Sequence, residues 1–197
     1  MIEDLAGECR MPLCYGGGVK TSEQAEKIMD LGVEKVAISS SAIEKKEIVG
    51  EIASRVGRQS VVVVLDVKKR FFGSRYEIFI KNGSVNTGLD PVEFAMEMQG
   101  KGAGELVINS IDNDGVMKGY DFEIIQKIRK AVHIPVTALG GAGSLEDIGN
   151  LIREHGIIGA SAGSLFVFKG KFRAVLISYP SAQEKEELIK GNILALN

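Results

Sequence analysis

The sequence contains no tryptophan and only two cysteines, two histidines and four prolines among its 197 residues. Cys9 and Cys14 fit neither a metal-ligand spacing nor a disulfide framework, which argues against a cysteine-stapled fold and indicates a reducing compartment, the cytoplasm. The net charge is only -2, so no basic field predicts nucleic-acid or membrane-surface partners. No apolar run has membrane-spanning length, and residues 1–11 lack the hydrophobic region of a signal peptide.

Glycine, in contrast, is abundant, with 24 residues and no low-complexity segment. This abundance indicates many backbone positions that need special angles or close approach. The length and the absence of a linker predict one domain over residues 1–197, with a core large enough to need no metal or disulfide.

Apolar strand-like runs alternate with runs of helical period along the chain. Strands apolar on both faces belong in a parallel sheet covered by helices, so the pattern predicts an α/β fold, either a doubly wound sheet or a (βα) barrel. A hairpin with an Asn82-Gly83 turn is expected within residues 71–88. The expected strands are 13–15, 36–38, 60–66, 106–109, 134–138 and 157–161, and the expected helices are 21–31, 44–56, 91–101, 121–131, 144–154 and 181–190.

An internal repeat favours the barrel. Residues 12–41 align with residues 135–164 at a constant offset of 123, and both copies show proline, a short strand, Gly-Gly, a helix, a second strand and a small-residue turn. A duplicated half-barrel explains this arrangement, and chance similarity between two βα units is the alternative. The identical pairs are Pro12/Pro135, Gly17/Gly140, Gly18/Gly141, Glu23/Glu146, Ala37/Ala160 and Ser41/Ser164.

Two glycine loops, at residues 16–18 and 140–143, each follow a strand and precede a helix. Each is paired, one βα unit later, with a small-residue turn, at residues 39–41 and 162–164. Glycine lets a backbone approach a ligand, and barrels bind phosphate at the carboxyl ends of their strands, so two phosphate sites are expected. Tight-turn chemistry alone is the alternative. The predicted contacts are Gly17, Gly18, Ser39, Ser40, Gly140, Gly141, Gly163 and Ser164.

Carboxylates follow two of the central strands. Asp66 ends the apolar run SVVVVLD, which predicts a general acid/base at the mouth of the sheet; the alternative is a turn cap or a partner of Lys68 or Lys69. Asp112 and Asp114 follow the next strand in NSIDNDG, and at least one of them is expected to contact substrate. Asn109, on that strand, either reaches substrate or bonds within the strand layer.

Lys35 and Glu105 each begin an expected strand, so in a barrel they lie at the face opposite the catalytic mouth. A charge ring there would gate an entry into the barrel. The alternative is an ordinary surface ion pair, worth at most about 1 kcal/mol.

These motifs together resemble the cyclase subunit of imidazole glycerol phosphate synthase: PLCYGGG, RQSVVVVLD, NTG, GAGELVINSIDNDG, GYD and GGAGSLED. The resemblance implies a (βα)8 TIM barrel that takes ammonia from a class I glutaminase subunit and has no metal and no cofactor. Its phosphorylated ribonucleotide substrate is converted to imidazole glycerol phosphate and an aminoimidazole carboxamide ribotide, a lyase step of histidine biosynthesis.

The same resemblance assigns roles to single residues. It makes Asp66 one of two catalytic aspartates, and it places Gln59 at the interface with the glutaminase. It further implies phosphate contacts at Gly18, Gly141, Gly163 and Ser164, substrate contacts at Asp114 and Gly115, and an ammonia gate at Lys35 and Glu105.

The chain departs from that family's usual residues at Ser39, Asn109, Asn113, Val116 and Leu139. The stretches NTGLDPVEFAMEM and GSLFVFKGKFRAVLISYPS resemble a side branch that accompanies sugar amidotransferases in surface-polysaccharide (lipopolysaccharide) synthesis. There the barrel delivers ammonia for an acetamidino sugar, so this role is the second functional hypothesis. A non-catalytic phosphate-binding fragment is the third.

The resemblance places residues 1–10 on the second helix of the barrel. An incomplete barrel of about six of the eight βα units is therefore expected, lacking the first strand–helix unit and the second strand. The other catalytic aspartate belongs to the first strand, so these residues alone are expected to be inactive and poorly behaved in solution.

Overall fold

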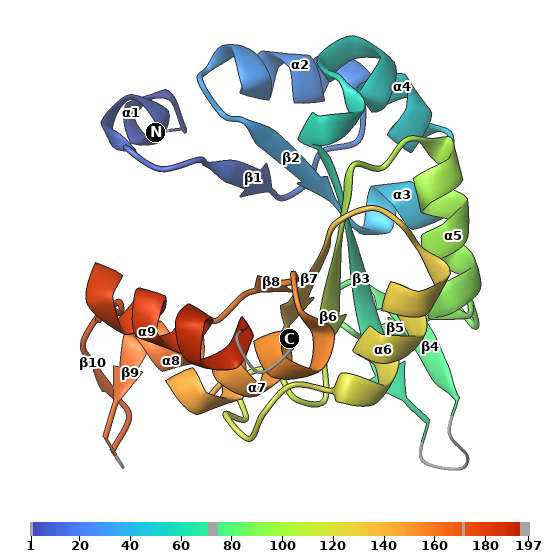
Figure 1. Ribbon diagram of the computed structural model, residues 1–197. Coiled ribbons are helices and arrows are strands. Elements are labelled where there is room, and N and C mark those ends of the chain that lie inside the picture. Colours follow the sequence, from blue (N-terminus) through green and yellow to red (C-terminus); the bar gives the residue numbers. More distant parts are fainter. Residues whose placement is uncertain (1, 71–74, 171, 194–197) are drawn as a thin grey trace.

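The computed structural model describes residues 2–70, 75–170 and 172–193, and its centre is a sheet of six parallel strands (Figure 1). The sheet curls into a half-barrel, with β1 and β8 as the outer strands of its hydrogen-bonded path. This confirms the predicted parallel α/β architecture. In sheet order the strands are β1 (Cys14–Gly16), β2 (Lys35–Ile38), β3 (Val61–Lys69), β6 (Glu105–Ser110), β7 (Val136–Leu139) and β8 (Gly159–Ala160).

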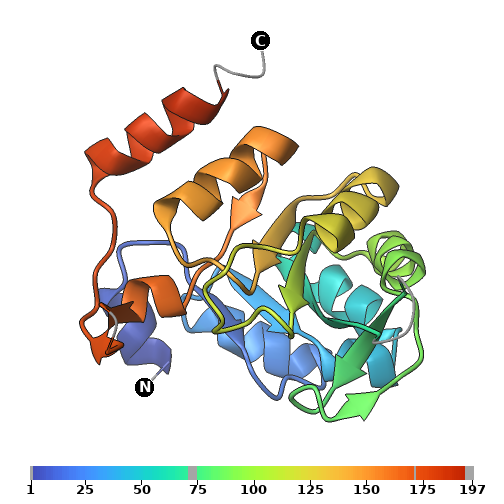
Figure 2. The same cartoon turned by 90° about the horizontal axis from the view of Figure 1, so that it is seen from below.

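Amphipathic helices cover the convex face of the sheet, and Figure 2 shows them outside the strands. Their apolar stripes form the core with the outward-facing strand residues; Ile48, Val49 and Ile52 of one helix, for example, are almost completely buried. α9 (Ala182–Ile193) packs along α7 (Figures 1 and 2). The covering helices are α2 (Ser22–Asp30), α4 (Ile48–Val56), α5 (Pro91–Lys101), α6 (Phe122–Ala131) and α7 (Leu145–His155).

β3 runs three residues beyond Asp66, so the expected strand end at that residue is wrong. The extension survives because it pairs with β4 (Tyr76–Ile80), which in turn pairs with β5 (Val85–Asn86), both antiparallel. The expected turn is confirmed, since Asn82 and Gly83 both have positive φ, at 57° and 76°. Residues 71–74 of the expected hairpin lie outside the described residues.

The expected helix over residues 44–56 begins too early, because α4 starts at Ile48. Glu44 is the last residue of a separate short helix, α3 (Ser40–Glu44), and the extended backbone of Lys45 (φ -143°, ψ 92°) follows it. The resemblance placed residues 1–10 on a helix, and α1 (Ile2–Glu8) is found there. The remaining elements are too short for a prediction from the sequence. They are the 3-10 turn η1 (Arg58–Ser60), α8 (Ser164–Val167), β9 (Phe168–Lys169) and β10 (Ala174–Val175).

The repeat is visible in the helix starts. Thr21 and Gln24 form a capping box at the start of α2, and Ser144 and Asp147 form the same device at the start of α7. The two boxes are one repeat length apart at both positions. Because a capping box pairs two otherwise unpaired backbone N–H groups, the local sequence alone explains where these helices begin.

Candidate active site

Alternate residues of the central strands face opposite sides of the sheet. Leu65 and Val67 of β3 are fully buried against the helices, while Asp66 between them is half-buried on the concave side. The sheet register places Asp66 beside Asn109, and Asn109 beside Leu139 of β7. The carboxyl ends of three strands therefore meet around Asp66 at the mouth of the half-barrel.

The Asp66 carboxylate is held from both sides. Asn109 Nδ2 donates to its Oδ1 at 2.8 Å, and Ser39 Oγ, from the turn after β2, donates to its Oδ2 at 3.3 Å. The alternative of an ion pair with a neighbouring lysine does not hold, because the ammonium of Lys68 lies 3.5 Å from Asp112 and that of Lys69 lies 2.6 Å from Glu123. This geometry fits a partly buried acid/base group better than a turn cap.

The two carboxylates of the loop after β6 differ in their contacts. Asp112 accepts from the backbone N–H of Lys69 at 3.3 Å and pairs with Lys68, so it ties this loop to the end of β3. Asp114 is exposed. Gly115 adopts a positive φ of 72°, and its carbonyl accepts from the Arg173 guanidinium. Asp112 therefore fits a loop-stabilising role, and Asp114 is the better placed of the two for substrate.

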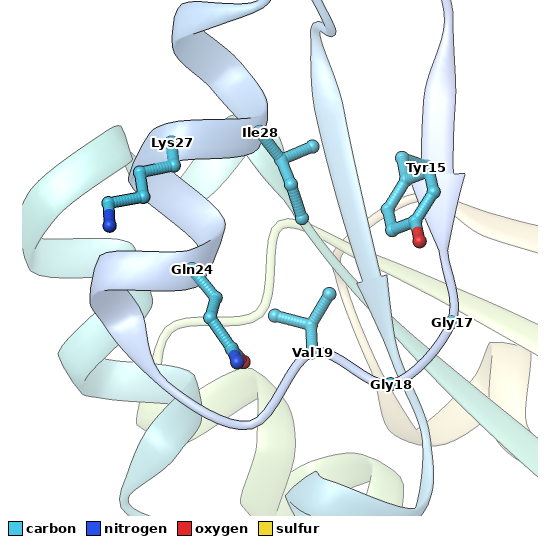
Figure 3. Close-up of a pocket in the computed structure, with 7 residues that line it drawn as sticks. All are labelled: Tyr15, Gly17, Gly18, Val19, Gln24, Lys27 and Ile28. Carbon is cyan, nitrogen blue, oxygen red and sulfur yellow. The ribbon is translucent and has the colours of Figure 1, made fainter. Parts of the chain in front are cut away.

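The first glycine loop borders a pocket between β1 and α2, of about 310 Å³ (Figure 3). Tyr15 points from β1 toward that helix, so its strand neighbours Cys14 and Gly16 face the concave side. Gly17 and Gly18 have φ values of 141° and 68°, which favour glycine. A methyl group on Gly18 would meet nothing within 4 Å, so open space lies beside this loop.

The second glycine loop is packed more tightly. A Cβ on Gly140 would lie 2.6 Å from the carbonyl oxygen of Ser110, and one on Gly141 would lie 2.0 Å from that of Gly119. These glycines are therefore required by backbone contact with the loop that carries Asp112 and Asp114. Gly163, just before α8, resembles Gly18, because a methyl group on it would also meet nothing within 4 Å. Open space thus lies beside one residue of each predicted phosphate site.

At the opposite end of the strands, Lys35 Nζ lies 2.5 Å from Glu105 Oε2. The Glu105 side chain is only 15% exposed, and its second oxygen accepts from Thr137 Oγ1 at 2.7 Å, so this is more than a surface pair. Burial, reinforced by Glu105 and opposed by Lys35, raises the pKa of the Cys14 thiol beside them. Thr137 was not predicted as a site residue; a polar residue on the concave face of an apolar strand is the signal that would have found it.

A hollow of about 640 Å³ opens at this end, lined by residues that precede or begin four of the strands, including Glu34, Lys35, Gln59 and Pro135. In the part of the chain that the structure describes, no cluster of three or more His, Cys, Asp or Glu is arranged to hold a metal ion. None of the described helices is long and apolar enough to cross a membrane.

Comparison with known proteins agrees with this architecture. The pattern of the histidine biosynthesis protein family matches residues 1–173. The chain belongs to this family.

Individual relatives within the family carry related names. A protein of Vibrio vulnificus (strain YJ016), provisionally named imidazole glycerol phosphate synthase subunit hisF3, is 55% identical over 190 residues, which cover 96% of this chain and 73% of the relative. A Pseudomonas aeruginosa protein, provisionally named subunit hisF2, is 47% identical over 184 residues (93% and 73%). The imidazole glycerol phosphate synthase subunit HisF of Dictyoglomus turgidum is 39% identical over 168 residues (85% and 66%). The resemblance predicted from the motifs is thereby confirmed.

Proposed function

We propose that this member of the histidine biosynthesis family is an imidazole glycerol phosphate synthase cyclase, a lyase that works with a glutaminase partner. Ammonia released by the partner reacts with a phosphorylated ribonucleotide, and the products are imidazole glycerol phosphate and an aminoimidazole carboxamide ribotide. Relatives named as subunits of this synthase support the assignment. The proposal places the protein in the cytoplasm, consistent with two free thiols, Cys9 and Cys14.

The position of Asp66 carries this proposal. Its carboxylate lies at the carboxyl ends of the parallel strands, where enzymes of this architecture place their chemistry. One glycine loop lies on each side of it along the sheet, at the ends of β1 and β7. A substrate with a phosphate at each end would then present its middle to Asp66. In this proposal Asp112 supports the loop, and the phosphate and substrate contacts are Gly17, Gly18, Ser39, Ser40, Asp114, Gly115, Gly140, Gly141, Gly163 and Ser164.

The ion pair at the opposite end supports an ammonia route. On the concave face of β6, Val107 lies between Glu105 and Asn109. On the concave face of β3, Val64 lies between the start of the strand and Asp66. An apolar lining favours neutral ammonia over ammonium, because burying an unpaired charge is costly. Lys35 and Glu105 would act as the gate, and the 640 Å³ hollow around Gln59 would receive the glutaminase.

The test is formation of imidazole glycerol phosphate from ammonium salt. It is run on this chain and on the chain preceded by the strands that the resemblance implies. Asp66→Asn should lower kcat by about 10²–10⁴-fold with a smaller effect on KM, since a general acid/base acts in the transition state. Asp30→Asn, the same change on the exposed end of α2, is the control. Wild-type turnover in Asp66→Asn would reduce Asp66 to a structural residue.

A second candidate is an ammonia-delivering partner of a sugar amidotransferase in surface-polysaccharide synthesis. The observation that favours it is the pair of stretches NTGLDPVEFAMEM and GSLFVFKGKFRAVLISYPS, which resemble that branch of the family. Growth of a cyclase-deficient histidine auxotroph discriminates the two. Restored growth without histidine supports the cyclase, while activation of a glutaminase without cyclase turnover supports ammonia delivery. Anion binding without either activity would identify a phosphate-binding fragment.

A further inference from the structure

Asn109 occupies the centre of the site, between Asp66 and the second glycine loop. Its backbone pairs with Asp66 on one side and Leu139 on the other. Its side-chain Nδ2 donates to Asp66 Oδ1 at 2.8 Å, which is shorter than the 3.3 Å contact that Ser39 makes with Oδ2. Asn109 therefore makes the tighter of these two contacts to the predicted acid/base group.

The other end of the same amide is unusual. Asn109 Oδ1 is buried, and it has no hydrogen-bond partner among the described residues. It lies against Gly140, where a methyl group would approach it to 3.3 Å. If the amide were rotated by 180°, Asn109 Oδ1 would face Asp66 Oδ1, and two acceptors would repel each other. The observed orientation leaves Asn109 Oδ1 buried without a partner in the described part of the chain, which has a desolvation cost, but it keeps the Nδ2 donor on Asp66.

We propose that Asn109 is a positioning residue, which fixes one oxygen of the Asp66 carboxylate and leaves the other to exchange a proton with the substrate. This rests on the proposed function. A hydrogen bond to Oδ1 sets the rotation of the carboxyl group, so that Oδ2, held only by the rotatable Ser39 hydroxyl among the described residues, faces the reacting atoms. Of the two alternatives that the sequence left open for Asn109, this role follows the hydrogen bond within the strand layer and not the direct substrate contact.

Turnover provides the first test, made on whichever form of the chain shows wild-type cyclase activity. Asn109→Leu keeps the approximate volume and removes the donor. Loss of a hydrogen bond to a charged group predicts a fall in kcat of about 10- to 100-fold, with KM changed less than about threefold. In an Asp66→Asn background the same change should alter kcat less than about threefold, because the group it positions is already gone. Asn150→Leu, at a half-buried position of α7 on the helical layer, is the matched control.

Nuclear magnetic resonance provides a second test that needs no turnover. The side-chain amide signals of Asn109, assigned by their loss in Asn109→Leu, should move when Asp66→Asn is introduced and stay in place with Asp114→Asn. If the Asn109 amide signals do not move when Asp66→Asn is introduced, the proposal is wrong. So would a rise in KM at constant kcat for Asn109→Leu, which would make Asn109 a substrate contact. Absence of wild-type turnover contradicts the proposed function, and the amide signals then decide on Asn109.

Discussion

Gly18 and Gly141 occupy equivalent positions of the internal repeat, yet the structure gives them different neighbours. We therefore expect Gly18→Ala and Gly141→Ala to differ sharply in stability. Both glycines have positive φ, at 68° and 112°, so alanine is strained at either. A methyl group on Gly18 meets nothing within 4 Å, whereas one on Gly141 would lie 2.0 Å from the Gly119 carbonyl oxygen.

The magnitudes follow from these contacts. Gly18→Ala should cost only the backbone strain of a left-handed residue, about 1–2 kcal/mol. Gly141→Ala adds overpacking of about 1–3 kcal/mol against backbone that must move. It also disturbs the 2.8 Å bond from Gly119 N–H to the Gly141 carbonyl. The total for Gly141→Ala is therefore about 2–5 kcal/mol.

Urea unfolding followed by circular dichroism measures both variants against the wild type. Equal free energies of unfolding for the two variants would refute the close packing of the second loop on residues 110–119. Phosphate binding provides the converse contrast. The Gly18→Ala methyl enters open space beside the first predicted anion site, so this variant should lose affinity there while keeping most of its stability.

Three further predictions concern other parts of the molecule. Soaking crystals in sulfate should show two anions, one near Gly18 and Ser40 and one near Gly141, Gly163 and Ser164; anions found only elsewhere on an ordered mouth would contradict the phosphate sites. Hydrogen bonds from Lys127 and Lys69 hold the pKa of Glu123 at about 2, below its ordinary value of 4.5. Its stabilising contribution is therefore complete above about pH 4.5 and lost as the pH falls toward 2. Glu123→Gln should make the urea midpoint of unfolding depend less on pH over that range. Tyr76→Phe removes a buried hydroxyl that donates to Asp121 at 2.9 Å, and should lower the free energy of unfolding by about 1–3 kcal/mol, measured at pH 7; no change would show that the hairpin docks on α6 without this bond.

Much of the architecture was predictable from local pattern. The order of strands and helices follows from runs of apolar residues and from start signals such as Thr21 and Ser144. The helix over residues 91–101 is predicted to the residue, since Asp90 caps it, Pro91 occupies its first position and Gly102 ends it. The short helix α3 was missed and the start of α4 was placed at residue 44 in place of Ile48, because the extended residue Lys45 leaves no mark on helical periodicity.

For the predicted site, the structure agrees with the expected positions of some residues but does not test their roles. Asp66 and the Lys35–Glu105 pair are where the pattern placed them, at opposite ends of the strands. Their roles stay predictions. A bond of Asn109 within the strand layer was one of two alternatives, but Asp66 was not foreseen as its partner. The partner depends on how β3 and β6 align, and the alignment of two parallel strands is set by packing across the whole sheet.

The sequence by itself determined the parallel α/β class, the repeat, the helix starts and the family, because these depend on residue type and spacing along the chain. Tertiary structure alone decided which neighbours each polar group meets: that Lys68 and Lys69 turn away from Asp66, that Asn109 holds it, and that Gly140 and Gly141 are needed for backbone contact while Gly18 and Gly163 border open space. The physical reason is distance along the chain. Local propensities act over a few residues, whereas Asp66 and Asn109 lie 43 positions apart and meet only after the sheet has formed.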